Sequence, residues 1–269
     1  MMDSQHFCPQ VALIGFGEAS ECFARGAGWQ GRARGWDLLA SRRAVMAQCR
    51  VEAGNDAAAA LAGAEVVLSL VTADQALAAA RDYAALLPPG ALWLDMNSVA
   101  PATKRQAAEA VTAAGGRYVD VAVMAPVGRG LTVPLLVSGP DADTAAATLA
   151  LLGFDNVRVV GNAVGRASAI KLCRSVMVKG LEALSAECAA AAEAEGVLAE
   201  VTASLDASET AMPWIDRIAY NRERMATHGL RRAAEMDEAC AMLASLGVDP
   251  VMSRGTALSQ RAAATKELA

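Results

Sequence analysis

The feature that most constrains the fold is a short apolar run that ends in a glycine turn close to the amino terminus. Val11–Gly15 is apolar, Gly17 follows two residues later, and Glu18–Arg25 has the pattern of a helix. Gly15 permits a tight turn, and Gly17 allows the backbone to approach an anion at the helix N-terminus, where free N–H groups and the helix dipole favour negative charge. The segment therefore predicts a strand–turn–helix unit.

The same alternation continues over the following 145 or so residues, and its regularity predicts the fold class. Strands are expected at Arg34–Asp37, Val66–Val71, Ala91–Asp95, Tyr118–Val123, Leu135–Ser138 and Val157–Val160, with helices at Ser41–Ala53, Asp74–Leu87, Thr103–Ala114 and Asp141–Leu152. Strands that alternate with helices form a mostly parallel sheet covered on both faces. The sequence thus predicts an α/β protein with an N-terminal Rossmann-type sheet.

The pattern changes after Val160, where no further strand is expected. A long helix is predicted from about Arg166 to Glu195, and more helical segments follow to the end of the chain. We therefore expect a dinucleotide-binding domain over residues 1–161 and an all-α domain over 162–269. The long helix is expected to join the two, since no linker rich in Ser, Gly or Pro separates them.

Composition excludes several function classes. Hydrophobic residues make up 54% of the chain but aromatic residues only 4%, so helices should pack mainly through alanine. The formal net charge of −5 gives no bulk attraction for a phosphodiester backbone, and no nucleic-acid partner is expected. No apolar run approaches the roughly 20 residues of a membrane span, and Met1–Gln10 lacks a signal-peptide layout. A cytoplasmic protein without membrane contact is expected.

Cysteine and histidine spacing argues against a metal site. The chain has six cysteines and two histidines, and no CxxC pair occurs. Neither a zinc site nor a disulfide framework is supported by this spacing. We interpret the cysteines as buried or incidental thiols: Cys8, Cys22, Cys49, Cys173, Cys188 and Cys240.

The glycine turn and the acid that follows it form a candidate dinucleotide site. The fingerprint GxGxxG becomes Gly15-Phe16-Gly17-Glu18-Ala19-Ser20, with a small serine at the third position. Asp37, at the end of the second expected strand, is placed to accept hydrogen bonds from an adenosine ribose and to repel a 2′-phosphate, which favours NAD. Arg42 and Arg43 follow closely and leave NADP open, or serve only as solvated charges.

A lysine near the start of the long helix is the candidate acid/base. In Gly161-Asn-Ala-Val-Gly165 and the residues after it, glycines and small side chains allow the helix to approach the nucleotide domain. Lys171 would then face the cleft, with Arg174 and Ser175 on the same helical face. A nearby guanidinium and partial burial would both lower a lysine pKa toward the working pH, as proton transfer requires.

These motifs, together with Asp120-Val-Ala-Val-Met-Ala-Pro126, resemble the β-hydroxyacid dehydrogenases, which include the 3-hydroxyisobutyrate and 6-phosphogluconate dehydrogenases. The resemblance spans nearly the whole chain. It is nearest to a branch of NAD(P)-dependent oxidoreductases that carries a C-terminal domain of unknown function. It implies that Gly15 and Gly17 bind the pyrophosphate, that Ser98 lies near the nicotinamide ribose, that Lys171 is the acid/base, and that the all-α domains form a homodimer. Thr72, directly after the third expected strand, is also assigned to the cofactor.

Two departures from the family bear on the substrate. Where the family carries a Ser-Gly-Gly element for a substrate carboxylate, this chain has Met124-Ala125-Pro126, and the Asn-Asn pair one turn past the lysine is Arg174-Ser175. Ser175 is expected to orient a hydroxyl, and Arg174 to replace the missing carboxylate contact. His228 and Arg231, with Arg232 and Glu235, form either an anion site or a solvated face with an ion pair.

The expected activity is transfer of a hydride between nicotinamide and the carbinol carbon of a small hydroxy acid or polar alcohol. Lys171 would exchange the hydroxyl proton, while Ser175 and Arg174 would orient the substrate. Reduction of a C=N bond by an imine reductase, or a dinucleotide-sensing protein without turnover, are the alternatives from other classes. The sequence does not identify the substrate.

Overall fold

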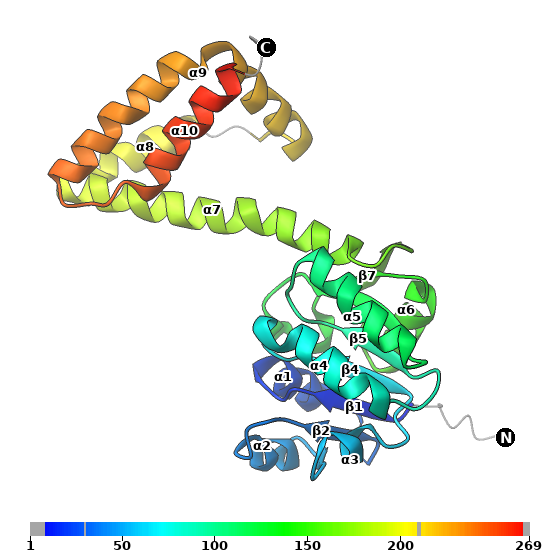
Figure 1. Ribbon diagram of the computed structural model, residues 1–269. Coiled ribbons are helices and arrows are strands. Elements are labelled where there is room, and N and C mark those ends of the chain that lie inside the picture. Colours follow the sequence, from blue (N-terminus) through cyan, green and yellow to red (C-terminus); the bar gives the residue numbers. More distant parts are fainter. Residues whose placement is uncertain (1–8, 30, 209–210, 266–269) are drawn as a thin grey trace. The chain divides into compact units, whose positions relative to one another are not determined.

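The computed structural model describes residues 9–29, 31–208 and 211–265, and it divides the chain into two compact units, residues 1–174 and 175–269 (Figure 1). The division lies inside α7 (Arg166–Ala194), whereas the sequence placed the domain boundary at residue 161. The first turn of α7 belongs to the first unit because Ala167 and Ser168 are buried there.

The first unit contains one eight-stranded sheet in the order β3-β2-β1-β4-β5-β6-β7-β8. Its strands are β1 (Val11–Ile14), β2 (Ala33–Trp36), β3 (Glu52–Ala53), β4 (Val66–Ser69), β5 (Leu92–Asp95), β6 (Arg117–Val123), β7 (Leu135–Ser138) and β8 (Val157–Gly161). All neighbouring pairs are parallel except β6 and β7, which are antiparallel. The predicted Rossmann-type, mostly parallel sheet is therefore confirmed.

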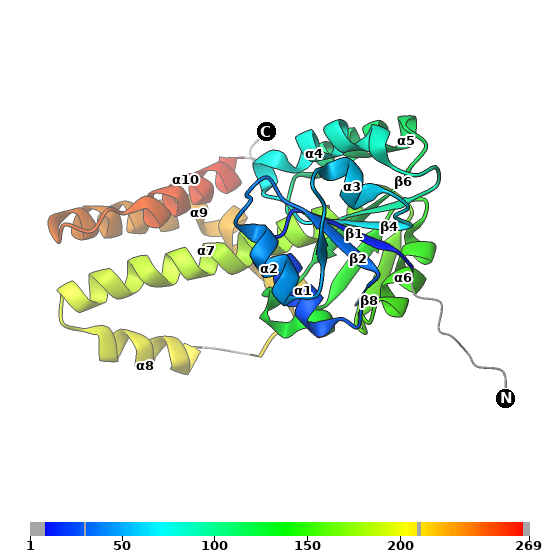
Figure 2. The same cartoon turned by 90° about the horizontal axis from the view of Figure 1, so that it is seen from below.

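Helices cover both faces of this sheet, as the apolar strands require. The helical elements of the first unit are α1 (Glu18–Gly26), α2 (Arg42–Gln48), α3 (Ala57–Leu61), η1 (Ala73–Gln75), α4 (Ala76–Tyr83), η2 (Ala84–Leu86), α5 (Pro101–Ala113), η3 (Val127–Thr132), α6 (Ala142–Leu151) and the start of α7. Figure 2 shows α1, α2 and α6 on one face and α3, α4 and α5 on the other.

Alternation along β1 shows how the two cores form. Val11 and Leu13 point to the core that contains Phe23 of α1, whereas Ala12 and Ile14 point to the core that contains Ala80 of α4. Successive side chains of a strand point to opposite faces, so a strand buried on both sides is apolar throughout. This explains the apolar runs of β1, β4 and β5 in the sequence.

Two local expectations were wrong. The helix expected over Ser41–Ala53 ends at Gln48, because Arg50 has a positive φ of 57° and Glu52–Ala53 pairs with β2 as the edge strand β3. The helix expected over Asp74–Leu87 is divided into η1, α4 and η2. In the first case, pairing of Glu52–Ala53 with β2 overrides local helix propensity.

The second unit is helical. After α7 it contains α8 (Leu198–Ser208), α9 (Trp214–Ser245) and α10 (Val251–Thr265). A β-carbon on Gly229 of α9 would lie 2.3 Å from the carbonyl oxygen of Gln260 in α10, so glycine is what allows these two backbones to approach closely. Ala233 and Ala264 are buried nearby, and the predicted packing through small residues is present in this pair.

The cysteines that the structure describes, Cys22, Cys49, Cys173, Cys188 and Cys240, are free thiols, and Cys49 alone of these is buried. Cys8 lies outside the described residues. None of the described helices combines the length and apolar composition that crossing a bilayer requires.

Glu187 of α7 stabilises the N-terminus of α10. Its carboxylate accepts hydrogen bonds from the backbone N–H groups of Met252 and Ser253, at 2.7 and 2.8 Å, and from the Ser253 hydroxyl at 2.6 Å. Burial raises the pKa of the Glu187 carboxyl, but these hydrogen bonds outweigh it and hold the pKa below its ordinary value of 4.5. The carboxylate thus acts as a helix cap supplied by another helix.

We predict that Glu187→Gln lowers the free energy of unfolding by about 1 kcal/mol at pH 7, as for loss of a helix cap. Because the folded-state pKa is lowered, this stabilisation is present above pH 4.5 and is lost as pH falls through the folded-state value. Urea unfolding of both proteins at pH 7 and pH 3 measures it. A difference that persists undiminished at pH 3 would contradict the assignment.

Candidate functional site

The glycine turn between β1 and α1 forms the centre of the candidate site. Gly15 has a φ of +84°, and a β-carbon there would lie 2.5 Å from the Leu70 carbonyl oxygen of the neighbouring strand end. At Gly17, which is the N-cap of α1, a β-carbon would meet no protein atom within 4 Å, and no side chain caps the helix. Gly15 is therefore required by the fold itself, whereas the space beside Gly17 is open to a ligand at a helix N-terminus.

Ser20 explains why the third glycine of the fingerprint is dispensable here. Its side chain is fully buried between helix and strand, and its hydroxyl donates a 2.6 Å hydrogen bond to the Gly15 carbonyl. The small hydroxymethyl group fits the close helix–strand contact and leaves no polar atom unpaired. Phe16 contributes only its backbone to the turn, because its side chain is buried in the core.

Asp37 lies at the carboxyl end of β2 and is tied to the glycine turn. One carboxylate oxygen accepts the Phe16 N–H at 2.7 Å, and the other accepts the Leu39 N–H at 2.8 Å. Arg42 lies beside them: its guanidinium donates to the Phe16 carbonyl and, at 3.1 Å, to Glu21 of α1. The predicted acid and the competing arginine thus border the same turn.

Two cavities flank the carboxyl ends of β1 and β4. The first, of about 540 Å³, is lined by Gly15, Gly17, Asp37, Leu39, Arg42 and Thr72, among others. The second, of about 400 Å³, is lined by Glu18, Ala19, Asn97, Ser98, Ala125 and Lys171, among others. Both cavities also reach Leu70 and Val71. Parallel α/β sheets bind nucleotides in this crevice, where the strand order reverses.

Lys171 meets Ser98 at the second cavity. The Lys171 ammonium donates a 2.5 Å hydrogen bond to the Ser98 hydroxyl, across 73 residues of sequence. Lys171 is half-buried on the second turn of α7, and Ser98 follows β5. The structure thereby brings together the two residues that the sequence assigned to the acid/base and to the nicotinamide ribose.

Next to this pair lies a buried charged cluster that sequence reasoning missed. Lys104 of α5 is fully buried and donates to the backbone carbonyl of Asp95 at 2.6 Å and to its carboxylate at 2.9 Å. Its ammonium also lies 3.4 Å from the Asp120 carboxylate. Tyr118 donates a 2.6 Å hydrogen bond to Asp95, and burial together with the two carboxylates raises the pKa of the Tyr118 phenol well above its ordinary value.

The signal for this cluster was present in the sequence. Two apolar strands reach an aspartate, in Leu92-Trp-Leu-Asp95 and Tyr118-Val-Asp120, and a lysine follows the first of them in the next helix. Asp95 and Asp120 lie opposite each other in the parallel register. Two adjacent buried carboxylates require a buried cation, because an uncompensated charge in the interior is strongly destabilising.

Several other predicted residues lie elsewhere. Met124 packs against the core formed by Ala122, Leu136 and Ala167 and is not among the residues lining the second cavity, whereas Ala125 lines it. Arg174 is exposed at the end of the first unit, and Ser175 begins the second unit.

His228 and Arg231 are both exposed on α9 of the second unit. Arg231 forms an exposed ion pair with Glu235 at 2.6 Å. The ion-pair interpretation of this helix face is therefore the one that the structure shows.

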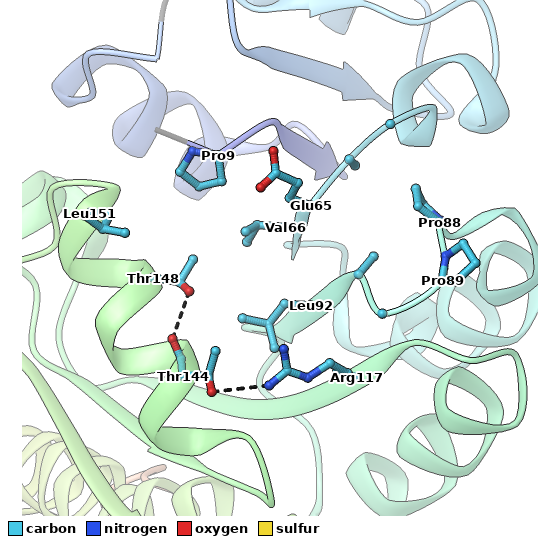
Figure 3. A pocket seen from close by; sticks show the side chains of 14 residues that line it. Pro9, Glu65, Val66, Pro88, Pro89, Leu92, Arg117, Thr144, Thr148 and Leu151 are labelled. Carbon is cyan, nitrogen blue, oxygen red and sulfur yellow. Dashed lines mark hydrogen bonds between the residues drawn. The ribbon is translucent and has the colours of Figure 1, made fainter. Parts of the chain in front are cut away.

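A third cavity, of about 350 Å³, lies at the opposite ends of the strands, near the amino ends of β4, β5 and β6 (Figure 3). Its polar side chains already have protein partners: Arg117 pairs with Asp141, which lies outside the lining, and donates to Thr144 of the lining at 3.2 Å. Glu65 accepts a weak backbone hydrogen bond from Gln10. This cavity is far from the glycine turn in the sheet and holds none of the predicted site residues.

Among the described residues, no three His, Cys, Asp or Glu side chains are grouped so that they could hold a metal ion. The first two cavities contain groups that could hold a ligand. Their open helix N-terminus, their carboxylate beside the turn and their lysine–serine pair fit a dinucleotide cofactor.

Comparison with known proteins agrees with this geometry. Residues 10–154 match the family described as the NAD binding domain of 6-phosphogluconate dehydrogenase, and residues 192–263 match a domain of unknown function, DUF1932. The first match covers the whole glycine turn, Asp37 and the buried cluster.

Solved structures are similar over nearly the whole chain. A conserved hypothetical protein from Sinorhizobium meliloti 1021 is 37% identical, covering 98% of this chain and 91% of that one, with a TM-score of 0.64. MTH1747, described as structurally similar to 3-hydroxyacid dehydrogenases, is 29% identical, with coverages of 96% and 98% and a TM-score of 0.62. A reductive aminase from Aspergillus terreus, solved with NADPH and ethyl-5-oxohexanoate, shares the fold at 21% identity, with coverages of 97% and 95% and a TM-score of 0.71.

The two glycines of the turn should respond differently to a methyl group. We predict that Gly15→Ala destabilises the fold by at least about 1–3 kcal/mol, because its positive φ and the Leu70 carbonyl both oppose a β-carbon. Gly17→Ala should leave the melting temperature near wild type but weaken NAD(H) binding by roughly tenfold or more. Thermal melting and calorimetric titration with NADH measure the two effects. Unchanged NADH affinity in Gly17→Ala would show that the open space is not a cofactor site.

Proposed function

The chain belongs to the family of the NAD binding domain of 6-phosphogluconate dehydrogenase, and on this basis we propose that it is an NAD(P)-dependent dehydrogenase acting on a small hydroxy acid or polar alcohol. The observation that carries the proposal is the Lys171–Ser98 hydrogen bond at the second cavity. It places a candidate proton carrier beside the cavity that follows the glycine turn.

The chain's own residues would divide the work as follows. Gly17 and the N-terminus of α1 would hold the pyrophosphate, Asp37 and Thr72 the adenosine half, and Ser98 the nicotinamide half. When bound, the nicotinamide cofactor supplies the hydride-transfer chemistry. The protein supplies the positioning and the proton transfer.

Lys171 would exchange a proton between its Nζ atom and the substrate oxygen. Its hydrogen bond to Ser98 directs the ammonium at the cavity, and the Ser98 hydroxyl can pass on a hydrogen bond as the proton leaves. Leu70, Val71 and Ala125 give the cavity apolar walls that limit competing contacts with water. Ser175 and Arg174 are the proposed orienting groups for the substrate.

The state of Arg42 supports NAD as the cofactor. An arginine near this position can accommodate a 2′-phosphate, but here Arg42 is bound to Glu21 and to the Phe16 carbonyl. The Asp37 carboxylate faces the same cavity and would repel a 2′-phosphate. NAD is therefore the proposed cofactor, and NADP would require Arg42 to leave Glu21.

A second candidate is reduction of a C=N bond. Apart from Glu18, Asn97, Ser98 and Lys171, the residues that line the second cavity are apolar, as suits an uncharged imine. Imine reductases share this fold, for example that from Pseudomonas sp. with a TM-score of 0.74 at 17% identity. A substrate screen of hydroxy acids, ketones and cyclic imines with NADH and NADPH separates the two candidates. A protein that binds cofactor but turns over none of them would instead be a dinucleotide sensor.

A homodimer formed through the helical unit is also proposed. The unit exposes large apolar side chains along its helices, including Val176, Leu181, Ile215, Leu230 and Leu258. Exposed apolar surface of this extent is typical of an interface between subunits. Sedimentation equilibrium at micromolar concentration distinguishes the dimer from a monomer.

Cofactor choice gives the first prediction from this assignment. Asp37→Ala should weaken NAD binding much more than NADP binding, because the carboxylate that recognises the ribose hydroxyls is removed and its repulsion of a 2′-phosphate disappears. Dissociation constants for NADH and NADPH, measured by fluorescence titration of wild type and variant, check it. Equal weakening of both cofactors would remove the basis for preferring NAD.

The acid/base role gives the second prediction. Lys171→Ala should lower kcat by at least roughly 10²-fold while NADH affinity stays near wild type. Lys171→Arg should restore little, because a guanidinium with a pKa above about 12 does not exchange protons near neutrality. Steady-state rates with the best substrate of the screen, together with NADH titration, measure both. Near-normal turnover by either variant would contradict the acid/base role of Lys171 and favour a water molecule held by Ser175 as the proton carrier.

A further inference from the structure

Lys104 is a fully buried lysine for which neither cofactor binding nor proton transfer accounts. Its ammonium contacts three oxygen atoms: the Asp95 carbonyl at 2.6 Å, the Asp95 carboxylate at 2.9 Å and the Asp120 carboxylate at 3.4 Å. Lysine is almost never fully buried without such partners, and a buried ion pair adds little net stability compared with apolar packing. Besides neutralising Lys104, both carboxylates accept hydrogen bonds from residues close to the site.

Asp95 fixes the conformation of the loop that carries Ser98. Its carboxylate accepts the Asn97 backbone N–H at 3.0 Å and the Asn97 side-chain amide at 2.8 Å. The same amide nitrogen donates to Ser69 at 3.0 Å. The carbonyl oxygen of the Asn97 side chain has no hydrogen-bond partner among the described residues. Asn97 and Ser98 both line the second cavity. Asp95 thus fixes the backbone and the amide directly before Ser98.

Asp120 binds the first turn of α7, the helix that carries Lys171. One carboxylate oxygen accepts the Ser168 hydroxyl at 2.6 Å, and the other accepts the Ser168 backbone N–H at 3.0 Å. The Ser138 hydroxyl donates to Asp120 at 3.2 Å and accepts the Ala167 N–H at 2.9 Å. These are N–H groups of the first turn of α7, which a negative charge caps favourably. Lys171 lies less than one turn beyond Ser168.

We propose that Lys104 is a positioning residue: by joining Asp95 to Asp120 it fixes the Ser98 loop relative to the start of α7, and so holds Lys171 in contact with Ser98. The two carboxylates lie opposite each other on β5 and β6 and would repel without a cation between them. The Lys104 ammonium lies close to both carboxylates, and its attraction for each offsets their mutual repulsion. Its consequence for turnover rests on the proposed acid/base role of Lys171, but the positioning itself does not.

The chain allows a direct test, because it has only four lysines and one of them, Lys179, is exposed further along α7. Trace acetylation with acetic anhydride followed by mass spectrometry gives the ratio of labelling at Lys171 to labelling at Lys179. Neither cofactor nor substrate is needed, so failure of the proposed dehydrogenase activity would leave this measurement unaffected. In wild type, the hydrogen bond to Ser98 and partial burial should protect Lys171.

Two variants disturb the positioning at different points. Ser168→Ala removes the hydroxyl contact between α7 and Asp120 but keeps all charges. The double variant Lys104→Met with Asp120→Asn removes the bridge but keeps the net charge of the cluster, so it avoids the two unpaired carboxylates that could unfold Lys104→Met alone. Circular dichroism and thermal melting establish that both are folded at the labelling temperature.

We expect the labelling ratio to rise about tenfold in both variants, the size of effect that loss of one charge-assisted hydrogen bond produces. Glu187→Gln is the matched control, since it removes a helix cap of the same kind within the second unit, and its ratio should stay within twofold of wild type. A ratio within twofold of wild type in the two folded variants, or an equal rise in the control, overturns the proposal.

Discussion

The buried ion pair between Lys104 and the aspartates at the ends of β5 and β6 is the interaction on which the candidate site depends. Placing three charges in the interior is costly, and the cost is offset only when each charge has several partners at short distance. Here the backbone of α7, the serines of β7 and α7, and the Asn97 amide supply those partners. The elements that satisfy the charges are the same elements that carry Ser98 and Lys171. The hydrogen bonds that compensate the buried charges are therefore also the hydrogen bonds that fix the segments carrying Ser98 and Lys171.

The glycine turn represents a second constraint of a different kind. Gly15 is required by the protein itself, since the Leu70 carbonyl occupies the place of a β-carbon. At Gly17, no protein atom lies close enough to exclude a β-carbon. The space beside its backbone is therefore open to a ligand that approaches the helix N-terminus. Ser20 shows that the third position needs only a small side chain whose polar atom is paired. The departure from the glycine fingerprint is thus physically neutral.

The helical unit is built on small residues. Gly229 allows α9 and α10 to approach, alanines fill the contact, and Glu187 caps α10 from a separate helix. Alanine packing buries little area per residue, so a unit of this composition gains limited stability from its own core. Large apolar side chains remain exposed on it.

Much of this architecture could be predicted from the sequence, because strands buried on both faces appear as unbroken apolar runs and because the glycine turn has few conformational alternatives. Seven of the strands, most of the covering helices and the residues of the turn, with Asp37, Ser98 and Lys171, could be identified from local pattern or motif, whereas the short helix α3 was not expected. The edge strand β3 was not, since two residues pair only because β2 lies beside them. The contact between Ser98 and Lys171 and the state of Arg42 were decided by tertiary structure alone. The Lys104 cluster left a signal in the sequence, two aspartates at strand ends, but the strand register decided that they face each other. Each depends on which charges are brought together in a dry interior, and that is set by the register of neighbouring strands rather than by the residues adjacent in the chain.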